Sequence, residues 1–223
     1  MGGRPTRSSK IGEMTGLGRF AKRVVDLTVS LPAILILSIL FLLVAVAIKL
    51  DDGGAVFFRQ VRVGRGGRRF RVWKFRTMTE SHVDPTGPDL LSADDVRITR
   101  VGKVLRSFGL DELPQLLNVL GGSMSLVGPR PTLVYQVERY NDVQRRRLAA
   151  KPGITSLAVV SGRNALSWPE RIELDIEYID RWSLLLDSRI LLKTLWCVLV
   201  TREGLYGADG VNDPFVGPDD AGA

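Results

Sequence analysis

Residues 31–48 read LPAILILSILFLLVAVAI, and this run contains no charged side chain. It lies within a longer apolar segment, residues 24–48, in which Asp26 is the one charged residue. As an α-helix, the run from 31 to 48 extends about 27 Å at about 1.5 Å per residue. That length is close to the roughly 30 Å hydrocarbon core of a bilayer. The segment therefore predicts a helix embedded in a membrane.

Basic residues on both sides of this segment indicate how it enters the membrane. The cations before it are Arg4, Arg7, Lys10, Arg19, Lys22 and Arg23. The cations after it are Arg59, Arg62, Arg65, Arg68, Arg69, Arg71, Lys74 and Arg76. Because segments rich in Lys and Arg stay on the cytoplasmic side, both flanks favour that side. A re-entrant helical hairpin satisfies both flanks, whereas a single span does not.

Two points about this segment remain open. A cleaved signal peptide is a third interpretation, since Ala45-Val46-Ala47 resembles a cleavage site, but the apolar stretch exceeds the usual length of about 7–15 residues. The position of the bend is also open. Pro32 lacks an N–H and can break a helix, while a bend near Ser38 gives arms of more equal length. In a straight span, Pro32 would be a mild kink, which membrane helices tolerate.

The composition narrows the functional classes. The chain has 223 residues, a net charge of +7, 45% apolar residues and 25% charged residues. The basic balance favours anionic partners, whether nucleic acid, phospholipid headgroups or phosphorylated substrates. The single cysteine, Cys197, excludes an internal disulfide, and together with the single histidine, His82, it argues against a Cys/His zinc site.

The rest of the chain predicts a mainly helical α+β domain. Two short strands, at 56–58 and 70–75, flank a turn with the sequence Gly64-Arg65-Gly66-Gly67. Helical patterns cover 97–107, 112–120 and 132–149, with a rigid Pro-containing loop at 127–131. Ile172, Ile176 and Ile179 recur at helical spacing.

A further helix is predicted at about 188–201, with Asp187 as its cap. Arg189, Lys193 and Thr194 share one side, and Leu and Trp side chains cover the rest. This pattern is typical of an amphipathic helix at a membrane interface, although an ordinary core helix remains an alternative. Residues 202–223, rich in Gly, Asp and Pro, are predicted to be disordered.

Residues 106–120, RSFGLDELPQLLNVL, contain the candidate catalytic group. Pro114 fits the first turn of a helix, which places Asp111 and Glu112 at its N-terminus. The helix dipole stabilises negative charge there by about 0.3–1 kcal/mol and attracts phosphate to the same place. We therefore expect an ionised Asp111 that acts as a nucleophile or as a Mg²⁺ ligand. The alternative is a plain acidic helix cap.

Basic residues supply candidate phosphate ligands. Lys74 and Arg76 flank Phe75, Arg106 precedes the acidic pair, and Arg130 lies between two prolines. Arginine suits fixed, bidentate contact with phosphate oxygens. A solvated basic face near anionic lipid is the alternative, and it explains most of the cations between Arg59 and Arg71.

Four motifs give the chain a specific resemblance. They are KFRTM (74–78), DELPQ (111–115), SMSLVGPRP (123–131) and KPGIT (151–155). In this order they resemble the bacterial sugar transferase family, the monotopic polyprenol-phosphate phosphoglycosyl transferases, and the match runs from about residue 22 to 200. GRNALSW (162–168) also resembles the small members that consist of the catalytic unit alone.

The resemblance implies a two-step reaction. Asp111 would attack the phosphorus next to the sugar of a UDP-sugar, UMP would leave, and polyprenyl phosphate would then take the phosphosugar from the aspartyl enzyme. Mg²⁺ would be required, with Asp111 as its ligand, and Glu112 would act as a base or orienting group. The phosphate-binding residues would be Lys74, Arg76, Arg106, Arg130 and Arg163.

The resemblance also implies an arrangement at the membrane. A basic tail (1–23) would precede the re-entrant helix (24–48), a catalytic domain (49–201) and the disordered tail (202–223). The catalytic domain would lie on the cytoplasmic face of the bacterial inner membrane, where the carrier phosphate meets the UDP-sugar at the headgroup level. The family breaks its re-entrant helix near a Ser-Pro pair. Here the matching position is Ser38-Ile39, and the proline, Pro32, comes earlier.

Two rival functions remain at this stage. A nucleic-acid-binding protein would explain the positive charge, and it predicts salt-sensitive binding by a soluble protein. The apolar run at 31–48 argues against it, so we expect no nucleic-acid partner. A non-catalytic scaffold on the membrane would use the same anchor and basic surface, and an assay of UMP release separates it from an enzyme.

Overall fold

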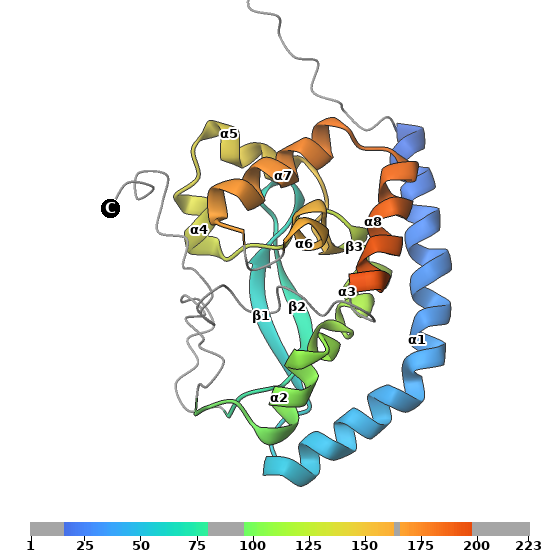
Figure 1. Cartoon of the computed structure of the whole chain (residues 1–223), viewed down its shortest axis with the longest axis vertical. Helices are drawn as coiled ribbons and strands as arrows, with labels where there is room; N and C mark the ends of the chain where they lie inside the picture. Colours follow the sequence, from blue (N-terminus) through green and yellow to red (C-terminus); the bar gives the residue numbers. More distant parts are fainter. Residues whose placement is uncertain (1–15, 80–95, 163–165, 198–223) are drawn as a thin grey trace, which may run out of the picture.

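The computed structural model describes residues 16–79, 96–162 and 166–197 (Figure 1). Its longest element is helix α1 (Gly16–Asp52), which is followed by a two-stranded ribbon and a set of shorter helices. The ribbon consists of β1 (Phe57–Val63) and β2 (Arg69–Phe75), with a short 3-10 helix, η1 (Arg65–Gly67), between them. The remaining elements are α2 (Arg100–Ser107), η2 (Leu110–Glu112), α3 (Gln115–Leu120), β3 (Ser125–Val127), α4 (Val134–Glu138), α5 (Asp142–Arg145), η3 (Arg146–Ala149), β4 (Gly153–Thr155), α6 (Leu157–Ser161), α7 (Trp168–Asp180) and α8 (Leu184–Trp196).

Helix α1 is continuous from Gly16 to Asp52, with Pro32 inside it. It is therefore longer at both ends than the predicted segment 24–48, and it takes in residues 16–23 of the predicted tail. Figure 1 shows that α1 bends part-way along, so that its second half turns under the ribbon and α2. Since Pro32 cannot donate to the preceding turn, it weakens the helix locally, while Ser38 Oγ donates to Leu35 O at 2.7 Å.

One face of α1 packs against the rest of the protein along both halves. Lys22, Asp26 and Ser30 are buried in the first half, and Val44 and Ile48 in the second. The opposite face carries exposed large apolar side chains, which we call the exposed apolar face. They are Leu17, Phe20, Val24, Leu27, Val29, Leu31, Leu35, Ile36, Ile39, Leu42, Leu43, Val46 and Leu50. By length and composition alone, α1 is the one helix among the described residues that could cross a membrane.

The ribbon confirms the predicted hairpin and extends it. The strands pair antiparallel from Phe57 opposite Phe75 to Val63 opposite Arg69. Gly66 and Gly67 close the turn with φ of 67° and 77°, a backbone region that favours glycine. Val63 also bridges to Thr132, so the loop after β3 meets β1 at the end of the strand.

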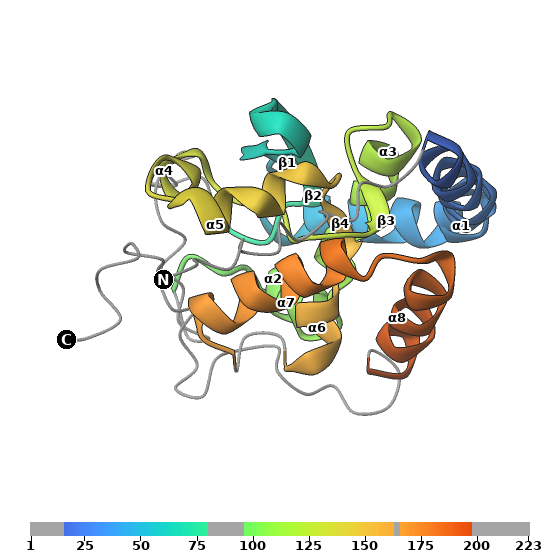
Figure 2. The same ribbon diagram turned by 90° about the horizontal axis from the view of Figure 1, so that it is seen from above.

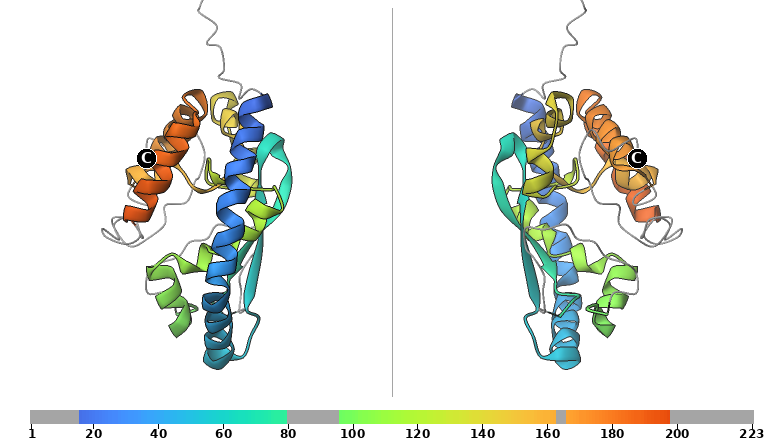
Figure 3. Two further views of the ribbon diagram at one scale, coloured as in Figure 1. Left: turned by 90° about the vertical axis from the view of Figure 1, so that its right-hand side faces the viewer. Right: turned by 90° about the vertical axis from the view of Figure 1, so that its left-hand side faces the viewer.

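The main core lies between the ribbon, α3 and the C-terminal helices. β3 and β4 form a second, parallel pair within it. Its buried side chains are Val72, Leu116, Val119, Met124, Leu126, Val127, Val160, Tyr178, Ile179 and Ile190. Figures 2 and 3 show α8 and the first half of α1 on the same side of this core.

Two predicted helices differ from the structure. The single helix expected at 132–149 is divided into α4, α5 and η3, because Asn141 starts a new helix by accepting a hydrogen bond from Gln144 N at 2.9 Å. Helix α8 begins at Leu184 and is capped by Ser183, which accepts from Leu186 N at 3.1 Å. Asp187, the predicted cap, is instead buried within the first turn.

Helix α8 also carries exposed large apolar side chains, including Leu185, Leu192, Leu195 and Trp196.

Candidate active site

Asn118 fixes α3 against the ribbon and so places the acidic pair. Its Oδ1 accepts a hydrogen bond from Trp73 N at 2.9 Å, and its Nδ2 donates to Arg71 O at 2.8 Å. These two hydrogen bonds join Asn118 to backbone atoms of β2 close to Lys74. Sequence reasoning missed Asn118, although the signal was present: it is a polar residue between Leu116 and Val119, which face the core.

Asp111 and Glu112 lie in η2, a 3-10 turn that precedes α3. Gly109 at φ 66° allows the chain to reverse before this turn. Pro114 is the N-cap of α3, not its first residue. The acidic pair is therefore close to the start of α3, as predicted, but outside its first turn.

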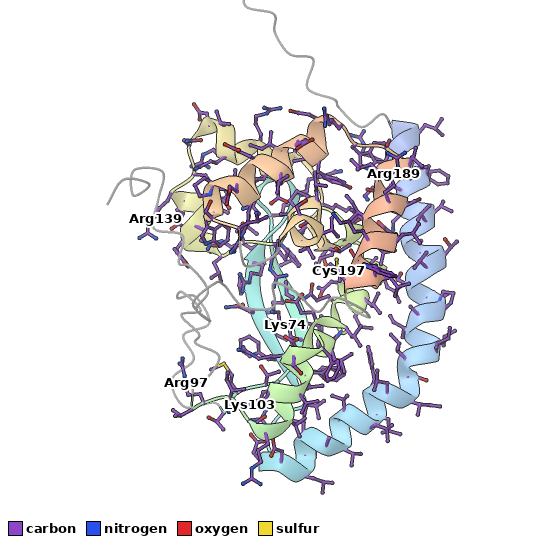
Figure 4. The ribbon with its side chains drawn as sticks, viewed as in Figure 1. Lys74, Arg97, Lys103, Arg139, Arg189 and Cys197 are labelled. Atoms are coloured by element: carbon purple, nitrogen blue, oxygen red, sulfur yellow. The ribbon has the colours of Figure 1, made fainter. Side chains whose placement is uncertain are left out.

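Glu112 accepts hydrogen bonds from two of the predicted phosphate ligands. Its Oε1 accepts from Lys74 Nζ at 3.0 Å and from Arg130 Nη2 at 2.6 Å, and its Oε2 accepts from Arg130 Nη1 at 3.3 Å. Burial opposes ionisation of this carboxyl, but Arg130 and Lys74 together hold its pKa well below the usual range. Glu112 is therefore ionised at neutral pH. Figure 4 labels Lys74, which lies on β2 in the middle of the molecule.

Asp111 is the neighbouring carboxylate and has a different environment. It is 9% exposed, and within the described part of the chain its side chain accepts no hydrogen bond and forms no ion pair. Burial raises its pKa, as does the charge of Glu112, while Lys74, Arg106 and Arg130 oppose the rise. The sequence suggested that a helix dipole would keep Asp111 ionised. In the structure the pKa of Asp111 is instead raised, because one 3-10 turn offers little dipole and the carboxyl is desolvated.

Arg106 reaches the site from the end of α2. Its Nε donates to Thr77 Oγ1 at 3.0 Å, and its Nη2 contacts Met78 Sδ at 3.6 Å. Both partners are neutral, so the guanidinium charge is not compensated by them. The charge of Arg106 also lowers the pKa of Asp111. The guanidinium group is therefore close enough to interact electrostatically with the Asp111 carboxylate.

Arg76 does not join this group. Its side chain is buried, and it forms a salt bridge with Asp52 and donates to Ala55 O at 2.6 Å. It therefore holds the end of α1 against the ribbon and has a structural contact in place of the phosphate contact expected from the sequence. Arg163, the fifth predicted phosphate ligand, lies outside the described residues.

Arg147 holds the backbone of Arg130 in place. Its Nη2 donates to Arg130 O at 3.3 Å and to Asp175 Oδ2 at 2.5 Å. The Arg147–Asp175 pair is almost fully buried, and Arg147 Nη1 also donates to Tyr140 OH at 2.5 Å. Sequence reasoning missed this residue, because three successive arginines at 145–147 resemble a solvated basic run.

The carboxylates could bind Mg²⁺ only if substrate phosphates supplied further ligands to the ion. Among the described residues no group of three or more His, Cys, Asp or Glu side chains could hold a metal. Mg²⁺, however, is commonly bound by one or two carboxylates together with substrate phosphates. Asp111, whose oxygens have no partner in the described part of the structure, fits as such a ligand, with Lys74, Arg106 and Arg130 nearby for phosphate.

Comparisons with known proteins agree with the motifs. The model of the family described as "Bacterial sugar transferase" matches residues 17–201. The chain is 44% identical over 200 residues to the uncharacterized sugar transferase EpsL of Bacillus subtilis, covering 89% of this chain and 97% of that protein.

Two relatives have more specific names. The UDP-glucose:undecaprenyl-phosphate glucose-1-phosphate transferase of Caulobacter vibrioides is 44% identical over 190 residues, 81% of this chain and 70% of that protein. The Klebsiella pneumoniae protein of the same name is 41% identical over 191 residues, 82% of this chain but 41% of that protein. Given the family match over residues 17–201 and these identities, the chain belongs to the bacterial sugar transferase family.

Proposed function

We propose that this protein transfers a sugar 1-phosphate from a UDP-sugar to polyprenyl phosphate, through a phosphosugar bound covalently to Asp111. The observation that carries the proposal is the contrast between two adjacent carboxylates. Glu112 forms salt bridges with Lys74 and Arg130, whereas Asp111 has no hydrogen-bonding partner among the described residues. A buried carboxylate with free oxygens beside three cations is suited to attack a phosphorus atom.

In the first step, an oxygen of Asp111 forms a bond to the phosphorus next to the sugar. The bond between that phosphorus and the bridging oxygen breaks, and UMP leaves with the electron pair. Lys74, Arg106 and Arg130 neutralise charge on the phosphate oxygens, as fixed cations do in phosphoryl transfer. A bound Mg²⁺, with Asp111 as a ligand, would supply further charge neutralisation.

In the second step, an oxygen of polyprenyl phosphate attacks the same phosphorus, and the Asp111 carboxylate is released. The product is a polyprenyl diphosphate sugar. Glu112 does not need to change protonation in this scheme, since Arg130 and Lys74 keep its pKa low. We assign it the role of orienting the two cations around the reacting phosphate.

We further propose that α1 is a re-entrant element which enters and leaves the membrane on the cytoplasmic side. Both halves of α1 pack on one domain: Lys22 pairs with Asp187, and Asp51 Oδ2 accepts from Val101 N at 3.0 Å. A straight span would carry these two ends to opposite sides of the bilayer. The exposed apolar face of α1 and the exposed Leu and Trp side chains of α8 would contact lipid, which brings the carrier phosphate to the level of the site.

The direct test is Asp111→Asn, with Asp142→Asn as a control at an exposed residue of α5. After incubation with UDP-sugar alone, we expect intact-mass analysis to detect a phosphosugar adduct on the wild type and on Asp142→Asn. Asp111→Asn should form no adduct and should lose UMP release by on the order of 10³-fold or more. Near wild-type UMP release in Asp111→Asn would remove Asp111 as the nucleophile.

The fold of Asp111→Asn can be checked in the same samples. A carboxyl whose pKa is raised in the folded state destabilises that state as pH increases through this pKa. Removing it should therefore leave thermal stability at neutral pH unchanged or higher. A non-catalytic scaffold, the alternative function, predicts no UMP release by any variant with any UDP-sugar.

A further inference from the structure

Two cations meet at the far end of α3, away from the acidic pair. A Cβ built on Gly122 would lie 3.6 Å from Arg23 Nη2 and 3.8 Å from Lys151 Nζ. Asp111 and Glu112 precede α3 and Gly122 follows it, so about 9 Å of helix separates the two places. Figure 2 shows the end of α3 beside the first half of α1, which carries Arg23.

Among the described residues, neither of these cations forms a salt bridge with a carboxylate. Arg23 donates to two backbone carbonyls, Val119 O at 2.5 Å and Leu120 O at 2.7 Å. Lys151 has no hydrogen bond or ion pair within the part of the chain that the structure describes. The nearby carboxylate of Asp26 accepts hydrogen bonds at Oδ1 from Ser125 Oγ and Leu126 N, at 3.0 and 2.9 Å.

The electrostatic environment of Lys151 agrees with an excess of positive charge. Burial lowers the pKa of its ammonium group, and so do the charges of Arg23, Arg65 and Lys22, with Asp26 opposing. A half-buried ammonium group surrounded by other cations is stabilised by an anion. The place is also at the edge of the exposed apolar face of α1, since Phe20 and Val24, three residues before and one residue after Arg23, are 67% and 43% exposed.

We propose that Arg23 and Lys151, across Gly122, bind the phosphate of an anionic phospholipid headgroup. The phosphate ester would lie between the guanidinium and the ammonium group, next to the point where α1 enters the apolar region. The site is separate from the catalytic pair, and it rests on the proposed function only in that α1 must lie in the membrane. Such a contact would fix the depth and rotation of the first half of α1.

The test uses a pair of substitutions at one position. Gly122 has φ of +79°, a region in which Asn and Asp are the most tolerated side chains. Gly122→Asp would place a carboxylate between Arg23 and Lys151 and so replace the lipid phosphate. Gly122→Asn has almost the same shape without the charge, and it is the matched control for backbone strain.

The measurement is native mass spectrometry of the purified full chain in detergent with equimolar phosphatidylglycerol and phosphatidylcholine. The wild type and Gly122→Asn should retain about tenfold more phosphatidylglycerol than phosphatidylcholine. Gly122→Asp and Lys151→Gln should retain the two lipids equally, and Lys103→Gln, at an exposed position on α2 (labelled in Figure 4), should behave as the wild type.

Three outcomes would overturn the proposal. The first is no preference in the wild type, and the second is an equal loss in Gly122→Asp and Gly122→Asn. The third is displacement of phosphatidylglycerol by millimolar inorganic phosphate, which would assign the place to a free anion. Adduct formation with UDP-sugar alone should persist in Gly122→Asp, so failure of the lipid site and failure of the proposed catalysis are distinguishable.

Discussion

Lys74 Nζ and Glu112 Oε1 lie 3.0 Å apart, although 38 residues separate them in the chain. This contact joins the ribbon to η2, and Arg130 adds a second contact to Glu112 from the loop after β3. The same carboxylate that holds these cations also raises the pKa of its neighbour Asp111, in addition to the larger effect of burial. Glu112 therefore contacts both cations and also contributes to the raised pKa of the proposed nucleophile.

We predict that Glu112→Gln shifts the pH dependence of kcat/KM. Asp111 must be ionised to attack phosphorus, so the rate rises with pH through its pKa. Neutralising Glu112 removes one cause that raises this pKa, while Lys74 and Arg130 continue to lower it. The acid limb of the profile should move to lower pH, while the maximal rate falls by about 10²-fold because the cations lose their orientation.

The profile should be measured by UMP release, with Glu138→Gln as a control at an exposed residue of α4. An acid limb that stays in place, or moves to higher pH, would contradict the electrostatic coupling between Glu112 and Asp111. A lower maximal rate without a shift would leave Glu112 with an orienting role only.

Substitution of Lys74 should affect activity, whereas substitution of Arg76 should affect stability. We predict that Lys74→Met lowers UMP release by about 10²-fold or more with little change in thermal stability. Arg76→Met should instead lower the free energy of unfolding by roughly 1.5–3 kcal/mol, because it removes the buried hydrogen bond to Ala55 O and the ion pair with Asp52. Thermal unfolding in detergent and UMP release, measured on the same samples, check both expectations. A stable, inactive Arg76→Met would restore Arg76 as a phosphate ligand.

This pair illustrates what the sequence could predict. The apolar run, the β-hairpin, the helix that contains Ile172, Ile176 and Ile179, and the grouping of Lys74 and Arg130 near the acidic pair followed from local patterns or from motifs. Arg76 was assigned to the site because it is basic and two residues from Lys74. Side chains two apart on a strand do share a face, but Arg76 follows the end of β2, where Asp52 and Ala55 engage it. Its partner Asp52 lies at the end of α1, and no pattern within residues 74–78 reveals it.

The ionisation of Asp111 shows a second limit. The position of Pro114 correctly indicated that a helix starts nearby, and a helix start suggests stabilised negative charge. Burial decides the direction of the pKa shift, however, and burial of Asp111 depends on how η2 packs against β2 and α2. The same holds for Arg147, whose buried partner Asp175 comes from α7. Such contacts between distant segments require the fold itself.

The first half of α1 should be held by Lys22 and Asp187. Lys22 Nζ donates to Asp187 Oδ2 at 2.5 Å, and both side chains are buried. We predict that Lys22→Met destabilises the protein by about 3 kcal/mol, because Asp187 is left buried without its cation. Lys22→Met combined with Asp187→Leu should cost less than the sum of the single changes. Unfolding in detergent measures this coupling, and simple additivity would contradict it. Lys103→Met, at an exposed lysine of α2, should have no effect.

The two ends of α1 should face the same side of the membrane. Arg19 and Lys49 are exposed near the two ends of the helix, and Ile36, 77% exposed, lies between them. In a Cys197→Ser background, we predict that Arg19→Cys and Lys49→Cys react with a membrane-impermeant maleimide in inverted vesicles and are protected in intact spheroplasts. Ile36→Cys should be protected in both, because lipid covers the exposed apolar face. A helix that spans the bilayer would expose Arg19→Cys and Lys49→Cys on opposite sides, and that pattern would exclude the re-entrant arrangement. Reaction of Ile36→Cys in inverted vesicles would instead mean that α1 lies on the surface of the bilayer without entering it.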